Sequence, residues 1–189
     1  MNPPLPPQVQ QQLQLAIHCH SQGALDTAKS LYEAVLQSAP TAFDALNNLA
    51  LIESQTGRLH VATGLMRRAV ALQPGNASAL NNLAYNLQQL GQTDEAVRLY
   101  RQGLVIHPQD ADLRNNLGLL LKQLERLEEA LACFEEGLAQ TPNDLTLQAN
   151  RANVLQALGR AEEALAQYDQ ALALSPRHPV LWTNRARAL

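Results

Sequence analysis

Prolines recur every 34 residues through most of this 189-residue chain, and that period constrains the fold more than any other feature. They lie at Pro40, Pro74, Pro108, Pro142 and Pro176. Three further series keep the same spacing: Ala28, Ala62, Ala96, Ala130 and Ala164; the small residues Ala16, Ala50, Ala84, Gly118, Ala152 and Ala186; and the bulky residues Tyr32, Met66, Tyr100, Phe134 and Tyr168. Four coincident series predict an internal repeat of 34 residues.

Each repeat is predicted to be a hairpin of two helices. In residues 77–110, apolar residues recur at helical spacing in two blocks, 79–90 and 94–106. Gly91 lies between the blocks, where glycine adopts a left-handed helix cap at little cost, and Pro108 ends the second helix. The small residues let the two helices approach closely, and the bulky ones fill the space beside them. Glu125 replaces the glycine of the other repeats and is predicted to cost about 1 kcal/mol there.

The glycine turns divide the chain into five repeats and part of a sixth. The repeats span residues 9–42, 43–76, 77–110, 111–144 and 145–178, and residues 179–189 form the first helix of the sixth. Residues 1–8 are rich in proline and are predicted to be disordered. The sixth repeat lacks its second helix, which would leave Trp182 uncovered. We therefore expect the sequence to be the N-terminal piece of a longer protein and its last helix to be a candidate surface for self-association.

Composition argues against several classes of function. The net charge is −3 and neither sign clusters, so a nucleic-acid partner is not expected. The two cysteines are far apart, and no stretch is apolar enough to span a membrane, which favours a soluble cytoplasmic protein. No catalytic or cofactor motif occurs. Residues two apart on a helix point in different directions, so His18 and His20 are not expected to share a metal ion.

An asparagine series is the most informative polar feature. Asn48, Asn82, Asn116, Asn150 and Asn184 lie 34 residues apart on the first helix of successive repeats, and we call them the asparagine ladder. Around Asn82 the residues Ser78, Tyr85 and Gln89 fall on the same helical stripe, away from the buried leucines. A side-chain amide both donates and accepts hydrogen bonds, so it can pair with a peptide group whatever the side chains. The ladder predicts a site for an extended peptide.

The repeat resembles the tetratricopeptide repeat, as the segment ALNNLAYNLQQLGQTDEAVRLYRQGLVIHPQD (79–110) shows, and the resemblance covers residues 9–189. It implies an all-α, right-handed superhelix whose first helices line a concave groove. The groove residues would be the ladder, its neighbours and the residues one turn away: Asp44, Asp112, Asn47, Asn81, Asn115, Leu51, Tyr85 and Leu119. The fold by itself says little about function, because it carries many unrelated binding roles.

The ladder is also similar to that of the O-linked N-acetylglucosamine transferases, which hold substrate polypeptide in this way. Asp44 and Asp112 match the aspartates that contact substrate side chains there, whereas Ser78 and Thr146 do not. The similarity implies a substrate-recruiting arm of a larger glycosyltransferase. Resemblance to the adaptors that clamp chaperone C-termini is poor, because the groove lacks their basic residues.

Two alternatives remain open at this point. The ladder can be an inherited surface that duplication copied without use. Yet Arg151 and Arg185 interrupt the leucine series of Leu49, Leu83 and Leu117, while Asn150 and Asn184 persist beside them. The chain can also be a structural scaffold that acts through its convex face or its C-terminal end. The predicted partner is in either case a protein or peptide.

Overall fold

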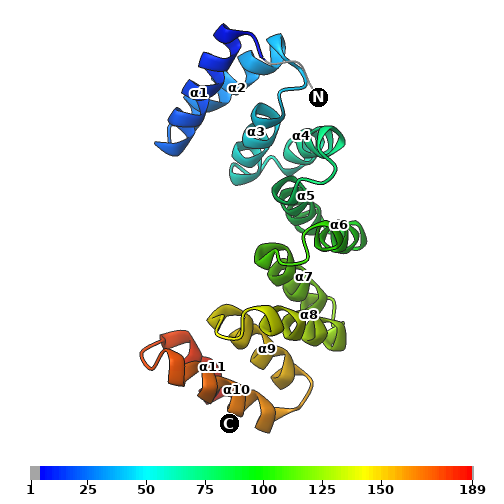
Figure 1. Ribbon diagram of the computed structural model, residues 1–189, viewed down its shortest axis with the longest axis vertical. Helices are drawn as coiled ribbons and strands as arrows, with labels where there is room; N and C mark the ends of the chain where they lie inside the picture. The colour runs from blue at the N-terminus through cyan, green and yellow to red at the C-terminus, as the bar shows by residue number, and fades with distance from the viewer. Residues whose placement is uncertain (1–4, 189) are drawn as a thin grey trace. The chain divides into compact units, whose positions relative to one another are not determined.

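The computed structural model describes residues 5–188, and all regular structure in that range is α-helical (Figure 1). Eleven helices occur there: α1 (Pro7–Ser21), α2 (Leu25–Ser38), α3 (Phe43–Gln55), α4 (Leu59–Leu72), α5 (Ala77–Gln89), α6 (Thr93–Ile106), α7 (Ala111–Gln123), α8 (Leu127–Gln140), α9 (Leu145–Ala157), α10 (Ala161–Leu174) and α11 (Pro179–Arg187). None of the described helices combines the length and apolar character that crossing a membrane requires.

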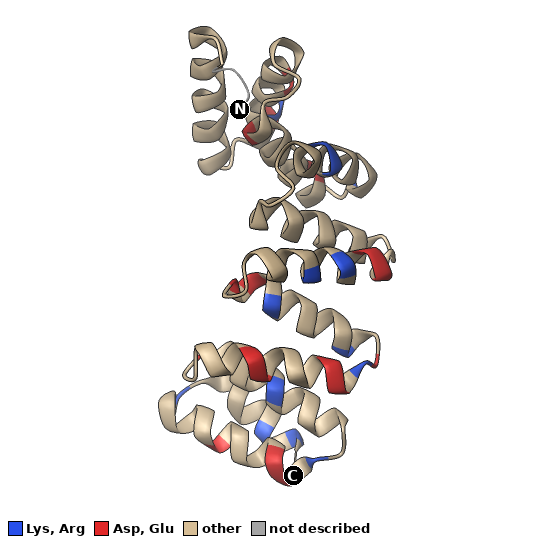
Figure 2. Cartoon of the chain, turned by 45° about the vertical axis from the view of Figure 1, so that its right-hand side comes forward, with Lys and Arg blue, Asp and Glu red and all other residues tan. Residues whose placement is uncertain are grey.

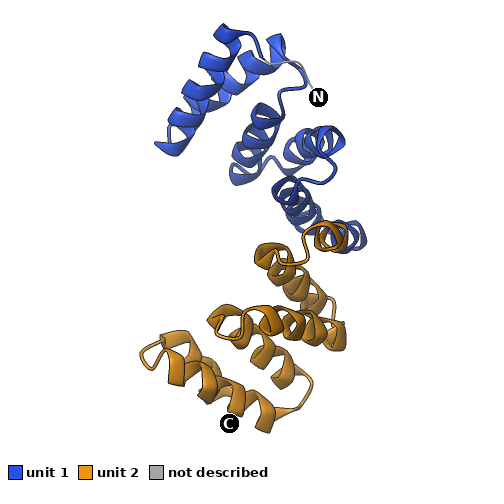
Figure 3. Ribbon diagram, in the orientation of Figure 1, with its two compact units in different colours: residues 1–99 blue, residues 100–189 orange. Residues whose placement is uncertain are grey.

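The chain divides into two compact units, residues 1–99 and 100–189 (Figure 3). In unit 1, α1 packs on α2 and α3 on α4, and the first helices α1, α3 and α5 touch in succession. In unit 2, α7 packs on α8, α9 on α10 and α11 on α10, and the first helices α7 and α9 touch. Stacked helical hairpins are what the sequence predicts, because a single hairpin cannot bury its own apolar face.

The small and bulky series form the centre of this packing. Ala16, Ala50, Ala84 and Ala152 are fully buried, and so are the bulky residues Tyr32, Met66, Tyr100, Phe134 and Tyr168. Gly118 shows how close the approach is: a Cβ atom at this position would lie 2.5 Å from the ring of Phe134. The predicted role of the small residues is confirmed at this hairpin.

Backbone geometry explains the turns between paired helices. Gly23, Gly57, Gly91 and Gly159 have φ angles of 75° to 78°, in the left-handed region. Glu125 occupies the same place with φ 57°, so the predicted strained residue is present. A Cβ atom at any of these four glycines would meet no other atom within 4 Å. The cost of another residue there is therefore the cost of the left-handed backbone conformation itself.

The N-terminal segment differs from the prediction. Helix α1 begins at Pro7. Proline is well tolerated at the start of a helix, because the backbone N–H that it lacks would have no partner in the first turn. Leu5 is partly buried and packs against the core around Leu13 and Ala16. The prediction that residues 1–8 are disordered is therefore wrong for residues 5–8, and residues 1–4 lie outside the described range.

Replacing Glu125 with glycine should stabilise the chain by about 0.5–1 kcal/mol, because the left-handed conformation no longer strains a side chain. The reverse change at the equivalent position, Gly159→Ala, should destabilise it by about 1 kcal/mol. Urea unfolding followed by circular dichroism measures both. Equal midpoints for wild type and E125G would contradict this account of the turn.

Candidate peptide-binding face

The asparagine ladder is half-buried along its whole length. In unit 1, α3 carries Asn48 and α5 carries Asn82; in unit 2, α7, α9 and α11 carry Asn116, Asn150 and Asn184. The contacts α3–α5 and α7–α9 place consecutive members on touching helices within each unit. Each of these asparagines thus keeps part of its surface exposed to solvent.

Apolar and acidic side chains flank the ladder on the same helices. Tyr85 is 49% exposed and Leu119 39% exposed, whereas Leu51 is half-buried. Each lies three residues after a ladder asparagine, on the same side of its helix. Asp44 and Asp112, four residues before a ladder asparagine, are exposed. In each of these three repeats, an apolar side chain thus lies near a ladder asparagine. In two of the repeats, a carboxylate lies one helical turn before that asparagine.

One member of the ladder also joins two repeats. The Asn150 side-chain N–H donates to Asn115 Oδ1 at 2.8 Å, so α9 is tied to α7 and the Oδ1 atom of Asn150 stays available as an acceptor. Asn47 is the equivalent of Asn115 two repeats earlier, and its Oδ1 atom is buried without a hydrogen-bond partner among the described residues. Asn115, which the sequence only placed beside the ladder, therefore orients the ladder residue Asn150.

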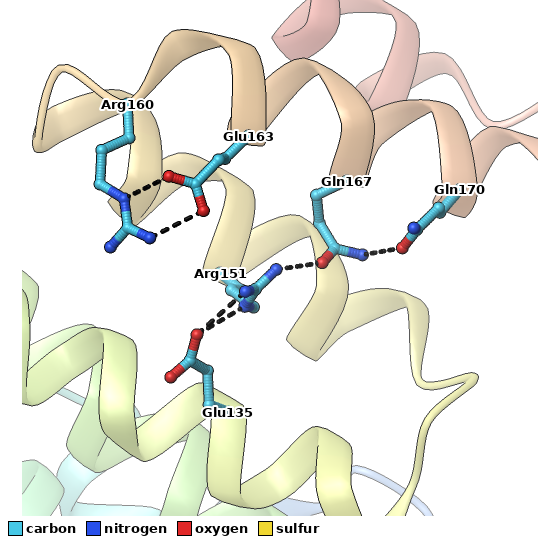
Figure 4. A network of polar contacts seen from close by, with 6 residues as sticks. All are labelled: Glu135, Arg151, Arg160, Glu163, Gln167 and Gln170. Atoms are coloured by element: carbon cyan, nitrogen blue, oxygen red, sulfur yellow. Dashed lines mark hydrogen bonds and ion pairs between the residues drawn. The ribbon is translucent and has the colours of Figure 1, made fainter.

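Arg151 and Arg185 have a different role from the one that their sequence position indicated. Arg151 bonds Glu135 at 2.9 Å, and Arg185 bonds Asp169 at 2.6 Å, in each case an acid sixteen residues earlier on the preceding second helix. Figure 4 shows Arg151 between Glu135 and Gln167. Bonding to Arg185 lowers the pKa of Asp169. Both arginines stabilise repeat junctions, so their replacement of leucine is compensated there and carries no information about the ladder.

A buried carboxylate, which the sequence reading missed, lies in unit 1. Glu53 is 2% exposed at a position where later repeats have Leu87, Leu121 and Leu155. Lys29 bonds it at 2.8 Å and Arg58 also pairs with it. Burial alone would raise the pKa of Glu53, but the hydrogen bonds from Arg58 and Lys29 outweigh burial and lower it. A charged residue in a leucine series is the signal that would have revealed this cluster.

The remaining candidate ligands and nucleophiles are structural. Cys133 is buried, and burial raises the pKa of its thiol to about 11, which keeps it neutral and unreactive. Cys19 is a half-buried free thiol beside the first core cluster. Within residues 5–188, no three His, Cys, Asp or Glu side chains are grouped so that they would hold a metal ion. A cytoplasmic location and the lack of a nucleic-acid partner stay predictions.

Charges are unevenly spread over the helices (Figure 2). Helices α1 and α5 carry no Asp, Glu, Lys or Arg, whereas α8 carries four glutamates. On α3 the carboxylate of Glu53 is buried and paired, which leaves Asp44 as the exposed charge of that helix. The first helices of unit 1 therefore present a nearly neutral ladder face.

These features belong to one family of proteins. A family model described as tetratricopeptide repeat matches residues 10–177. The chain is thus a member of the tetratricopeptide-repeat family, a class of protein–protein interaction module. Among curated proteins, none matches it.

Solved structures show the same fold. A tetratricopeptide-repeat protein from Parabacteroides merdae aligns over 95% of this chain and 72% of its own, with 22% identity and a TM-score of 0.87. A thermophilic protein of the family from Thermus thermophilus aligns over 95% and 98%, with 25% identity and a TM-score of 0.69. YrrB, described as having an unusual peptide-binding site, aligns over 94% and 91%, with 21% identity and a TM-score of 0.77.

Removing the Glu53 charge should give a pH-dependent loss of stability. Because the folded pKa of Glu53 is lowered, its ion pairs stabilise the fold above the unfolded pKa, and this contribution is lost as pH falls through the folded pKa. Glu53→Gln should therefore cost about 1–2 kcal/mol at pH 7 and much less below about pH 4. Urea unfolding at both pH values measures this. Glu128→Gln, at an exposed glutamate, is the control. A difference in unfolding free energy between the wild type and E53Q that is the same at both pH values would contradict the assignment.

Proposed function

We propose that this chain binds an extended segment of a partner protein along the first-helix faces, with the asparagine ladder contacting the backbone of that segment. The proposal takes the known role of the family, protein binding, and assigns it to one surface. It is made for each unit separately, with Asn48 and Asn82 in unit 1 and the other ladder members in unit 2.

The observation that carries the proposal is the state of Asn48 and Asn82. Both amides are half-exposed, and among the described residues neither side chain makes a hydrogen bond. Polar groups at a folded surface that pair with nothing but solvent are open to a ligand, and an amide matches the donor and the acceptor of a peptide group. Tyr85, half-exposed beside Asn82, adds an aromatic contact of the kind that binding surfaces favour.

The flanking charges indicate what kind of segment would bind. The ladder face of unit 1 has no exposed cation on α1, α3 or α5 and one exposed acid, Asp44. An acidic ligand would gain no ion pair there and would be repelled by Asp44. We therefore expect a neutral or weakly basic segment with apolar side chains that contact Leu51 and Tyr85.

Affinity should be modest. Each net hydrogen bond contributes about 0.5–1.5 kcal/mol, and ordering an extended peptide opposes binding. Asn150 has already used one N–H on Asn115, so it offers mainly its acceptor. These magnitudes predict a dissociation constant of roughly micromolar order, where 1 μM corresponds to about −8 kcal/mol.

A recruiting arm for a glycosyltransferase is a narrower idea that rests on the ladder alone. None of the similar structures named above is described as such an enzyme. The proposal therefore stops at peptide binding. The competing scaffold role remains open, and a pocket on the second-helix side of unit 2 favours a separate contact there.

The test uses short peptides selected from a random displayed library on the wild-type chain and then synthesised. Asn48→Ala and Asn82→Ala should each weaken binding of a selected peptide about 2–10-fold, and N-methylation of the peptide at the contacting residue should weaken it similarly, because both remove a backbone hydrogen bond. Fluorescence anisotropy of the labelled peptide measures the affinity.

Asn143→Ala, an exposed asparagine outside the helices, is the matched control and should leave binding unchanged. If the selected peptides bind equally well to the wild type and to a variant that combines N48A with N82A, the ladder of unit 1 is an inherited surface and the proposal fails.

A further inference from the structure

A pocket of about 500 Å³ opens on the second-helix side of unit 2, away from the ladder. Its walls come from α6 and α8, and its floor comes from α7. The floor is formed by Leu117 and Leu121, and the walls include Leu104, Ala132 and the buried Cys133. Two ion pairs border it, Arg101 with Glu129 and Arg114 with Glu136.

Small side chains create this pocket. Cys133 stands where the three earlier repeats hold the larger Leu31, Leu65 and Leu99. Ala132 is typical of its own position, which holds Ser30, Gly64 and Ala166 in other repeats and the larger Arg98 in one. One repeat later, Cys133 is replaced by Gln167. The pocket at that later junction is smaller, about 340 Å³, and Gln167 there bonds Arg151 (Figure 4). A hollow thus recurs at the equivalent place of the next junction, and what departs from the repeat here is its larger volume and the cysteine in its lining.

The edge of the pocket departs from the repeat as well. Val105 is 84% exposed, an unusual state for a branched apolar side chain. The equivalent positions in the other repeats hold Gln37, Ala71, Ala139 and Ala173. The changes at Cys133 and Val105 thus both place apolar surface at one junction, where its exposure to water is unfavourable.

The charge around the pocket is mainly acidic on the α8 side. Glu136 is 70% exposed at its side chain, whereas its partner Arg114 is buried, so the carboxylate is the charge that solvent meets. Glu128, in the first turn of α8, is exposed too, whereas Glu129 beside it is paired with Arg101 and Arg126. A ligand that is apolar in its centre and basic at its flanks would match this surface.

Helix α11 of the same chain has that chemistry. Val180 is 56% exposed and Trp182 52% exposed, while the helix contains no acid. Arg177 and Arg187 lie before and after these two residues and are exposed. Tryptophan is the side chain with the largest apolar area to bury at an interface, about 150–250 Å² for an aromatic residue.

We infer that the pocket between α6 and α8 receives helix α11 of a second copy of this chain, with Trp182 in the hollow and the flanking Arg177 and Arg187 facing Glu128 and Glu136 of α8. The surfaces on the two copies differ, so the contact is head-to-tail. The assembly keeps one free pocket at one end and one free helix at the other, so further copies add to it. Helix α11 also carries Asn184, so the contact involves the helix at the end of the ladder, whereas Asn48 and Asn82 of unit 1 take no part in it.

Sedimentation velocity on the wild-type chain at about 10–500 μM tests the inference, a range that reveals weak to moderate association. The average size should rise with concentration, and the emission of Trp182, the sole tryptophan, should shift to shorter wavelength. Ala132→Arg places an arginine in the wall of the pocket, as Arg98 does at the equivalent position one repeat earlier. It should lower the association constant at least tenfold. Val105→Gln, which copies Gln37, and Trp182→Gln should also weaken association.

Ala166→Arg is the matched control, since it adds the same side chain at the equivalent exposed position of the next repeat and should leave association unchanged. A mixture of A132R and W182Q should form dimers that do not grow, because only one intact pocket and one intact helix can meet. A wild-type chain that stays monomeric, association that survives A132R, or a mixture that does not pair would overturn the inference.

Discussion

The close approach of two helices at one small residue per repeat determines the rest of this structure. Where the small residue is Gly118, the ring of Phe134 fills the space that a Cβ would need. This contact sets the rotation of each first helix, because the small residue must face its partner helix. The ladder asparagine lies two residues before the small residue and is half-buried in the second to sixth repeats, whereas the first repeat has the exposed Gln14 at this place. The position of the ladder face is thus a consequence of hairpin packing.

Much of this was predictable from the sequence because the repeat is local. Proline, glycine and small-residue series at a period of 34 predict the hairpins, and the strain at Glu125 follows from the glycines that it replaces. Contacts between repeats were harder to predict. The pairing of Arg151 with Glu135 depends on which way a long side chain turns across a junction, and periodicity does not specify that direction. The buried Glu53 could have been noticed as a charge in a leucine series, but its two cations come from different elements.

The two sides of the hairpins carry different kinds of information. On the first helices, the same residue type recurs at each ladder position, which suits a ligand that repeats itself, as a peptide backbone does. On the second helices of unit 2, the informative residues are those that depart from the repeat, such as Cys133 and Val105. A departure suits a single, specific contact. Peptide binding is therefore proposed for the ladder and self-association for the pocket of unit 2.

The most direct test of the central claim is the side-chain amide NMR spectrum of the chain during titration with one selected peptide. Asparagine side-chain N–H signals respond to hydrogen bonding at the amide itself. If the ladder holds the peptide backbone, the signals of Asn48 and Asn82 shift in proportion to occupancy while that of Asn143 stays in place. Shifts confined to residues around the pocket of α6 and α8, with the ladder signals unmoved, would show that the first-helix face is not the binding surface.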